Sequence, residues 1–264
     1  MALNQYPSVY KKLETIILFD IMFSAILEDT GILRESMASI AELIDEAELV
    51  IRQDGIKLVS SDRAVVVVVD FFLDKSGFRE YNYSTDMRAG VNLLNLLRIL
   101  KRAGTDDIME IKVDKKIELK FKGSSSRKFT LPIIDVSKEE LPPIDKLDFA
   151  SSFEINSDIL SSAVDDTDLV SDTLLFLTAD NKVIINADSD QSAVELEITS
   201  LKDFKSSESS RARYSIEYLK KIIKAKKMSD FVSVAYSTDF PMRILFSVPG
   251  KSRLSFILAP RVEE

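Results

Sequence analysis

Two stretches decide how this chain folds: Val91–Gly104 (VNLLNLLRILKRAG) and Ser215–Met228 (SIEYLKKIIKAKKM). At about 100° per residue, each stretch predicts a helix with apolar residues on one face and basic residues on the opposite face. In each half of the chain a helix, a hairpin and a strand come before this stretch, and three short strands come after it. The sequence therefore predicts an α+β fold of two topologically similar domains, each ordered helix, hairpin, strand, helix and three strands.

The first half becomes regular from about Met22. Helical spacing of apolar residues over Gly31–Ala47 predicts a helix, and Asp54-Gly55 between two alternating runs predicts a hairpin turn. Residues 64–69 (AVVVVV) predict a buried strand, because β-branched residues favour strands. The three strands expected after the second helix are residues 108–113 (IMEIKV), 116–123 (KIELKFKG) and 127–134 (RKFTLPII).

The second half repeats this order. A strand over residues 149–155 leads into a helix over residues 157–170, and a hairpin over residues 173–188 turns at Asp180-Asn181. A strand over residues 193–200 (AVELEITS) precedes the second helix of this half. The last three strands expected are residues 231–237 (FVSVAYS), 242–248 (MRILFSV) and 254–260 (LSFILAP).

An extended linker is expected between the halves. Residues 135–149 (DVSKEELPPIDKLDF) are acidic, contain Pro142-Pro143 and show no sustained periodicity. The predicted layout is domain 1 over residues 22–134, the linker over residues 135–148 and domain 2 over residues 149–264. Residues 1–21 are either an upstream extension or a misplaced start.

The composition narrows the possible functions. The chain has 264 residues and a formal net charge of −8, with no cysteine and no histidine. Disulfide frameworks, thiol catalysis, thiolate zinc sites and histidine-based catalysis are therefore excluded. No apolar run reaches the roughly 18 residues of a membrane-spanning helix, so no membrane association is expected. We expect no catalytic residues, no metal and no cofactor.

Basic residues gather on the two helices although the protein is acidic. The basic face holds Arg98, Lys101 and Arg102 on the first helix and Lys220, Lys221, Lys224 and Lys227 on the second, while Lys226 strays toward the apolar side. One reading is a solvated face with cations near helix C-termini. The other reading is phosphate binding, favoured by the matched positions of the two faces. No groove-reading motif is present, so only contacts to the nucleic-acid backbone are predicted.

Five colinear segments carry a family resemblance. They are residues 43–71, 90–107, 128–144 (KFTLPIIDVSKEELPPI), 218–248 and the terminal 256–264 (FILAPRVEE). In these segments the chain resembles the sliding DNA clamp family of proliferating cell nuclear antigen, most closely the archaeal members, over residues 22–264. The resemblance implies a non-enzymatic processivity factor, in which three two-domain subunits close head to tail around duplex DNA with helices inside and sheets outside.

The resemblance also implies site residues. The DNA-facing set comprises Arg34, Arg98, Lys101, Arg102, Lys220, Lys221, Lys224 and Lys227. The partner-peptide set comprises Val65, Val68, Ile134, Val136, Leu141, Pro241, Ile257, Leu258, Ala259 and Pro260. The subunit-interface set, on two strands expected to be sheet edges, comprises Lys116, Ile117, Leu119, Lys120, Phe121 and Lys122 on one and Val194, Glu195 and Glu197 on the other.

The implied partners are duplex DNA without sequence preference, copies or paralogues of the chain in a trimer, a clamp loader, and DNA polymerase, ligase and nuclease acting through short peptides. If the protein is archaeal, the implied location is the cytoplasm, in association with the nucleoid. If it is eukaryotic, the implied location is the nucleus. One departure from the family is the acidic helix over residues 157–170, which predicts an uneven positive wall. Arg34, beside Glu35, is the only basic residue expected on the first helix.

Two alternatives remain open at this stage. A monomeric module with basic helices would bind DNA or another partner without sequence preference and without forming a ring. A nuclease would use Asp165, Asp166 and Asp168 with a divalent metal, although acids on a helix surface are common.

Overall fold

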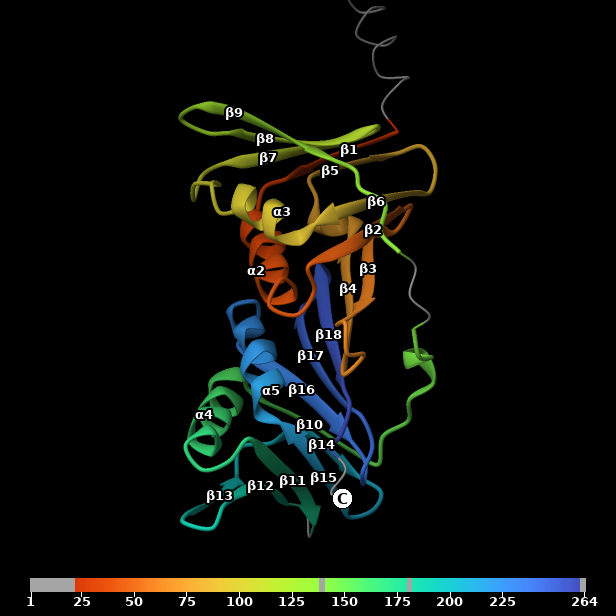
Figure 1. Cartoon of the computed structure of the whole chain (residues 1–264). Coiled ribbons are helices and arrows are strands. Elements are labelled where there is room, and N and C mark those ends of the chain that lie inside the picture. Colours follow the sequence, from red (N-terminus) through yellow and green to blue (C-terminus); the bar gives the residue numbers. More distant parts are fainter. Residues whose placement is uncertain (1–21, 138–140, 180–181, 262–264) are drawn as a thin grey trace, which may run out of the picture.

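The structure is a computed structural model that describes residues 22–137, 141–179 and 182–261 (Figure 1). Its first half runs through β1 (Phe23–Leu27), α2 (Thr30–Ile40), β2 (Glu46–Arg52), β3 (Gly55–Ser61), β4 (Val67–Asp74), η2 (Lys75–Gly77), β5 (Glu80–Tyr83), β6 (Met87–Asn92), α3 (Leu93–Leu100), β7 (Ile108–Val113), β8 (Lys116–Lys122) and β9 (Ser126–Pro132).

The second half repeats the order of helices and strands. It runs through β10 (Ser151–Asn156), α4 (Ser157–Asp168), β11 (Thr173–Ala179), β12 (Lys182–Asp188), β13 (Ala193–Ile198), β14 (Lys202–Ser206), β15 (Ser210–Ser215), α5 (Ile216–Ile222), η4 (Ile223–Lys227), β16 (Phe231–Tyr236), β17 (Met242–Val248) and β18 (Ser252–Leu258). Between β9 and β10, the described residues form only the short 3-10 turn η3 (Ile144–Lys146).

Three antiparallel sheets organise the described chain. Their strand orders are β5-β1-β7-β8-β9, β14-β10-β16-β17-β18-β4-β3-β2-β6 and β13-β12-β11-β15. The nine-stranded sheet crosses both halves because β18 pairs with β4, with Phe256 opposite Val69. The halves are therefore joined by main-chain pairing and not only by the linker.

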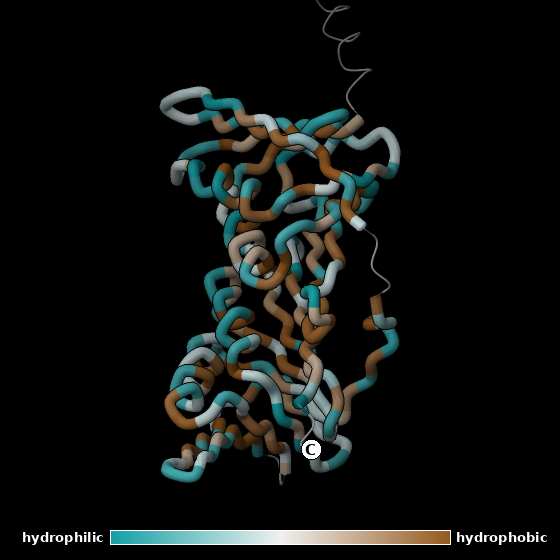
Figure 2. The backbone as a smooth tube through the Cα atoms, in the orientation of Figure 1, coloured by the Kyte–Doolittle hydropathy of each residue, from teal (hydrophilic) through white to brown (hydrophobic). Residues whose placement is uncertain are grey.

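The described helices α2, α3, α4 and α5 lie along one side of the molecule, and the sheets lie around them (Figure 1). One continuous cluster of buried side chains fills the space between the helices and the sheets. It includes Phe71, Leu96, Leu219 and Phe256. Figure 2 shows hydrophobic segments where helices and sheets meet, and more hydrophilic segments at hairpin tips. Strands with one solvated face alternate apolar and polar residues in this way.

Several predicted element boundaries differ from the structure, and two of the differences have a clear local cause. The helix expected over Gly31–Ala47 ends at Ile40, because Leu43 and Ile44 both donate main-chain hydrogen bonds to the carbonyl of Ile40 in a tight turn. The strand expected from residue 64 begins at Val67 instead. Residues 62–66 form a loop in which the Asp62 carboxylate accepts the N–H groups of residues 64, 66 and 67.

Five strands were not predicted: β1, β5, β6, β14 and β15. Strands β5 (EYNY) and β14 (KDFKS) end their sheets and have no buried residue, so their sequences carry little apolar alternation. The second basic helix also differs from expectation, because α-helical geometry stops at Ile222 and the segment continues as the 3-10 helix η4.

The expectation that strand 116–123 is a sheet edge is wrong. Strand β8 lies between β7 and β9, so its backbone is paired on both sides and β9 is the edge. Ile117, Leu119 and Phe121 are buried in the core and cannot form a subunit contact. The outward residues Lys116 and Lys122 form ion pairs with neighbouring glutamates, and Lys120 lies on the same outward face. By contrast, β13 ends its sheet as expected.

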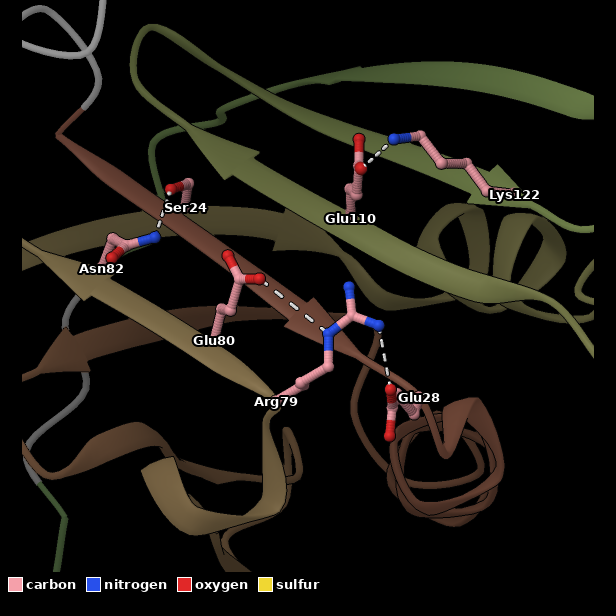
Figure 3. A network of polar contacts seen from close by, with 7 residues as sticks. All are labelled: Ser24, Glu28, Arg79, Glu80, Asn82, Glu110 and Lys122. Atoms are coloured by element: carbon pink, nitrogen blue, oxygen red, sulfur yellow. Dashed lines mark hydrogen bonds and ion pairs between the residues drawn. The ribbon is translucent and has the colours of Figure 1, made fainter. Parts of the chain in front are cut away.

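Figure 3 shows the outer face of this first sheet. Lys122 on β8 pairs with Glu110 on β7, and Arg79 pairs with Glu28 at 3.0 Å and with Glu80 at 3.9 Å. Acids and bases thus neutralise one another here. The basic character of β8 is compensated within its own sheet and does not create a strongly positive outer patch.

Candidate DNA-facing, partner-binding and edge sites

Helix α3 and the two residues that follow it present three basic residues to solvent. Asn92 caps it by accepting the N–H of Asn95 at 3.0 Å, and the apolar face, including Leu93 and Leu100, is buried. Arg98, Lys101 and Arg102 point to the opposite, exposed side, as predicted. Among the described residues, none of the three forms an ion pair, and Arg98 only contacts the neutral side chain of Asn95 at 3.5 Å. Their positive charge is uncompensated locally.

Lys220, Lys221, Lys224 and Lys227 lie opposite the buried residues Ile216, Leu219 and Ile222, as the helical spacing predicts, whereas Lys226 is half-buried against α4. Unlike the α3 cations, most of them are paired. The pairs are Lys220–Asp168 at 2.6 Å, Lys221–Glu217 at 2.7 Å, Lys224–Glu42 at 2.7 Å and Lys226–Asp158 at 3.0 Å. Lys227 is exposed at the end of η4.

The remaining helices contribute little positive charge. Arg34 on α2 forms an ion pair with its neighbour Glu35 at 2.9 Å. Helix α4 exposes Asp158, Asp165, Asp166 and Asp168 and carries no basic residue. The wall formed by the four helices is uneven, as the sequence predicted, and the structure adds that acids of α4 contact lysines of α5 and η4.

A network at the end of α3 joins it to the edge strand β9. The carboxylate of Asp107 accepts the N–H of Gly104 at 2.6 Å and forms an ion pair with the Arg127 guanidinium. Arg127, on β9, also donates to the main-chain carbonyl of Arg102 at 2.7 Å. Sequence reasoning missed both Asp107 and Arg127, because their contact depends on a loop and a strand that only the fold brings together.

The predicted peptide-binding residues fall into separate groups. Val68 and Ile257 face each other across β4 and β18 on the side of the sheet away from the helices. They form a small apolar cluster with Ile144 of the linker, with Val59 and Leu147 packed against it. Arg243 fixes this part of the linker by donating to the carbonyl of Ile144 at 3.1 Å. Sequence reasoning missed Ile144.

A second group surrounds the C-terminal tail. The N–H of Ala259 donates to the carbonyl of Val66 at 2.9 Å, which places the tail beside the loop that exposes Val65. Pro241 and Pro260 are half-buried. Leu258, in contrast, is fully buried on the helix-facing side of the sheet, so its inclusion in the peptide set is wrong.

A third group lines a groove of about 840 Å³ beneath the linker. Val136 and Leu141 contribute apolar surface, and Asp45, Glu48 and Asp62 contribute acidic surface. Ile134 does not line the groove, and its main chain forms a bridge with Gly90 on β6. The linker is thus held at both ends of the groove, by this bridge and by the Ile144 cluster.

An unpredicted contact connects the loop at this groove to the helices. Tyr218 on α5 donates to the Asp62 carboxylate at 2.8 Å. Burial, and then this hydrogen bond, raises the pKa of Tyr218 to about 12. The phenol is therefore neutral and remains a donor at physiological pH.

Two free edge strands lie at opposite ends of the elongated molecule (Figure 1). Strand β9 ends the first sheet and β13 ends the third sheet. Strand β9 carries the half-buried Phe129. Strand β13 carries the half-buried Val194 and Leu196. Glu195 and Glu197 are exposed on the outer side of β13.

Known proteins resemble this chain over nearly its whole length. The DNA polymerase sliding clamp of Pyrococcus furiosus is 30% identical over 248 residues, covering 92% of this chain and 99% of the relative. The DNA polymerase sliding clamp 1 of Pyrobaculum aerophilum is 33% identical over 231 residues, covering 85% of this chain and 92% of the relative. The chain belongs to the sliding DNA clamp family.

Two further comparisons agree with this membership. The family described as proliferating cell nuclear antigen, N-terminal domain, matches residues 22–138. The crystal structure of the proliferating cell nuclear antigen of Thermococcus kodakaraensis has the same fold, with a TM-score of 0.84 at 24% identity over 90% of this chain and 100% of that one. The α+β reading with two similar domains is confirmed as the DNA clamp fold.

Family membership makes this chain a DNA polymerase sliding clamp, which is a processivity factor and not an enzyme. The nuclease alternative assigned a metal to Asp165, Asp166 and Asp168. Asp168 instead forms an ion pair with Lys220, and within the described ranges no group of three or more acids is arranged to hold a metal ion. No helix in the described part is long and apolar enough to cross a membrane.

Proposed function

We propose that three copies of this clamp subunit close head to tail into a ring around duplex DNA. The observation that carries this proposal is the junction between β18 and β4. It already joins the two domains of one chain edge to edge, and the corresponding strands of the repeat, β9 and β13, each keep one unpaired edge at opposite ends. An unpaired edge is a template for another strand.

The internal repeat also predicts how the two edges pair. When the two domains are compared, the buried Leu131 on β9 is equivalent to Leu258 on β18. In the same way, Ile198 on β13 is equivalent to Leu73 on β4. Transferring the register of β18 and β4 then sets Phe129 opposite Val194 on the helix side. On the outer side it sets Lys128 opposite Glu195. Apolar residues meet apolar residues and a lysine meets a glutamate, which favours a contact between identical chains.

The inner wall of such a ring would be formed by the four helices. Basic residues on α3 would attract phosphates without reading the base sequence. The net charge of −8 would keep the rest of the surface from trapping DNA. We place this activity with the chromosome, in the cytoplasm of an archaeal cell.

The partners would dock on the side away from the helices. The exposed Val65 and the tail at Ala259 offer an apolar surface beside the extended linker, and the buried Val68–Ile257 pair supports it from beneath Ile144. A peptide with apolar anchors could pair with such a segment. We assign this surface to short peptides of the clamp loader and of DNA polymerase, ligase and nuclease.

The ring is tested by native mass and charge exchange. Light scattering should give a species close to three times the 29.7 kDa chain. Lys128→Glu or Glu195→Lys alone should weaken the ring, because reversal replaces an attraction of roughly 0.2–1 kcal/mol per junction with a repulsion of similar size. The two changes together should restore it. Equal masses for all four proteins would refute the register, and a monomeric wild type would refute self-closure.

Encirclement is tested by blocking DNA ends. Wild-type clamp at micromolar concentration is mixed with one linear duplex whose ends are open and one whose ends both carry a bulky bound protein. A ring should thread onto the open duplex and be excluded from the blocked duplex. Equal, salt-sensitive binding to both would favour the alternative, a monomeric module that binds DNA from the side.

A further inference from the structure

We propose that duplex DNA in the clamp is held mainly by α3 of each subunit, and that carboxylates on α4, on α5 and just after α2 weaken the contact of α5 and η4 with DNA by holding Lys220, Lys221 and Lys224 in ion pairs. This inference rests on the proposed function, because it requires the helices to face DNA. It divides the predicted DNA-facing residues into a working group on α3 and a compensated group in the second domain.

The first step compares the charge on the helices of the second domain with the charge on α3. The acids Asp158, Asp165, Asp166 and Asp168 of α4 together with Glu217 equal in number the five lysines of α5 and η4. Helix α3 and the residues that end it carry Arg98, Lys101 and Arg102 with no acid. The second domain therefore presents a wall that is neutral on balance, whereas α3 is positive.

The second step is the geometry of the pairs. Lys220 contacts Asp168 at 2.6 Å, and Lys226 contacts Asp158 at 3.0 Å and the Ser161 hydroxyl at 3.2 Å. The hydrogen bond from Lys220 to Asp168 raises the lysine pKa, and the nearby charge of Asp165 acts in the same direction. The carboxylates thus occupy positions where a phosphate oxygen would have to bind.

The third step is what the pairs do to a phosphate. The side chains of Lys220 and Asp168 are 47% and 40% exposed, so water screens their attraction and the pair can open. A phosphate can still approach, but it must displace one carboxylate and sit near others of the same sign. Lys224 is held in the same way by Glu42 of the first domain at 2.7 Å. The acids weaken the second-domain contact without abolishing it.

A weak contact suits a ring that slides. Each phosphate contact adds about −0.9 to the slope of log K against log salt concentration. A clamp that stays on DNA because of its closed shape gains nothing from strong contacts, which would slow its movement. Asp168, Glu217 and Glu42 would therefore lower friction while α3 keeps the duplex positioned.

The experiment compares matched neutralisations in the full-length clamp. Affinity for an open-ended linear duplex is measured across a salt series for the wild type, Lys101→Gln, Lys220→Gln and Asp168→Asn. Asp114→Asn, at an exposed acid in the turn between β7 and β8, controls for overall charge. Native mass is measured for each variant, so that a broken ring is recognised. Should Asp168→Asn disturb folding, Glu42→Gln, which frees Lys224, replaces it.

Lys101→Gln should reduce affinity several-fold and make the salt slope shallower by about 1 per lost contact. Lys220→Gln should change the logarithm of the affinity, and also the salt slope, by less than half as much as Lys101→Gln does. Asp168→Asn should raise affinity and steepen the slope beyond the Asp114→Asn control. The inference is overturned if Lys220→Gln matches Lys101→Gln, or if Asp168→Asn only matches the control. Failure of the proposed function looks different, because wild-type binding would then be the same on blocked and open duplexes.

Discussion

Replacing Asp107 with alanine should destabilise the end of α3 and its connection to the edge strand β9. The Asp107 side chain is only 6% exposed. It accepts a hydrogen bond from the Gly104 N–H and forms an ion pair with the Arg127 guanidinium. Removing it leaves the guanidinium with the Arg102 carbonyl as its only described hydrogen-bond acceptor. Breaking a fully buried ion pair costs roughly 3–5 kcal/mol. Because 32% of the Arg127 side chain is exposed, water recovers part of this and we expect a loss of about 2–3 kcal/mol.

The assay is urea unfolding at one fixed protein concentration, since subunit association contributes to apparent stability. Asp107→Asn should lose less than Asp107→Ala, because an amide oxygen can still accept the Gly104 N–H. Asp107→Ala combined with Arg127→Met should be more stable than the sum of the single changes predicts, because the unpaired charge is then also removed. A loss below about 0.5 kcal/mol, with strictly additive changes, would show that this network does not anchor α3.

Three further outcomes follow from single contacts. Gly90→Ala should release the linker and speed its proteolysis, because a Cβ at Gly90 would lie 2.1 Å from the carbonyl oxygen of Ile134; unchanged cleavage would contradict this. Tyr218→Phe should cost about 0.5–1.5 kcal/mol in urea unfolding, since Asp62 keeps its three main-chain donors; a gain in stability would argue against the contact. Hydrogen bonds from two lysines lower the pKa of Glu118 from 4.5 to about 2, so its stabilisation is present above pH 4.5 and is lost as pH falls toward 2. Glu118→Gln should therefore unfold at lower urea than the wild type at neutral pH, with a difference that shrinks in acid.

Local chemistry made the repeat of elements predictable. The hairpin at Asp54-Gly55 forms because Gly55 adopts a φ of 154°, and a Cβ there would lie 2.2 Å from the carbonyl oxygen of Leu73. Only glycine fits such a close approach. The basic faces were predictable for a similar reason, since helical spacing alone fixes which side chains share a face.

The edges of the sheets could not be predicted in the same way. In a sheet with one solvated face, central and edge strands alternate apolar and polar residues identically. The alternation of β8 (KIELKFK) is thus compatible with either position, and only the pairing with β7 and β9 decides it. The same alternation explains Leu258, which follows the outward Ile257 and must therefore point into the core. Ion pairs between helices, such as Lys220–Asp168, depend on packing that no local pattern encodes.

The β18–β4 junction within one chain and the proposed β9–β13 junction between chains differ in chemistry. This difference indicates where a ring of these subunits would open. Across β18 and β4, Phe256, Val69 and their inward neighbours are fully buried in the continuous core. At the free edges, Phe129 and Val194 are only half-buried in the single chain, and the outer side carries Lys128 and Glu195. Separating β18 from β4 would expose core that the chain needs in order to fold, whereas separating β9 from β13 would expose a smaller apolar surface and two side chains, Lys128 and Glu195, that are already hydrated in the single chain. The junction between subunits is therefore the weaker of the two and the expected site of entry for DNA.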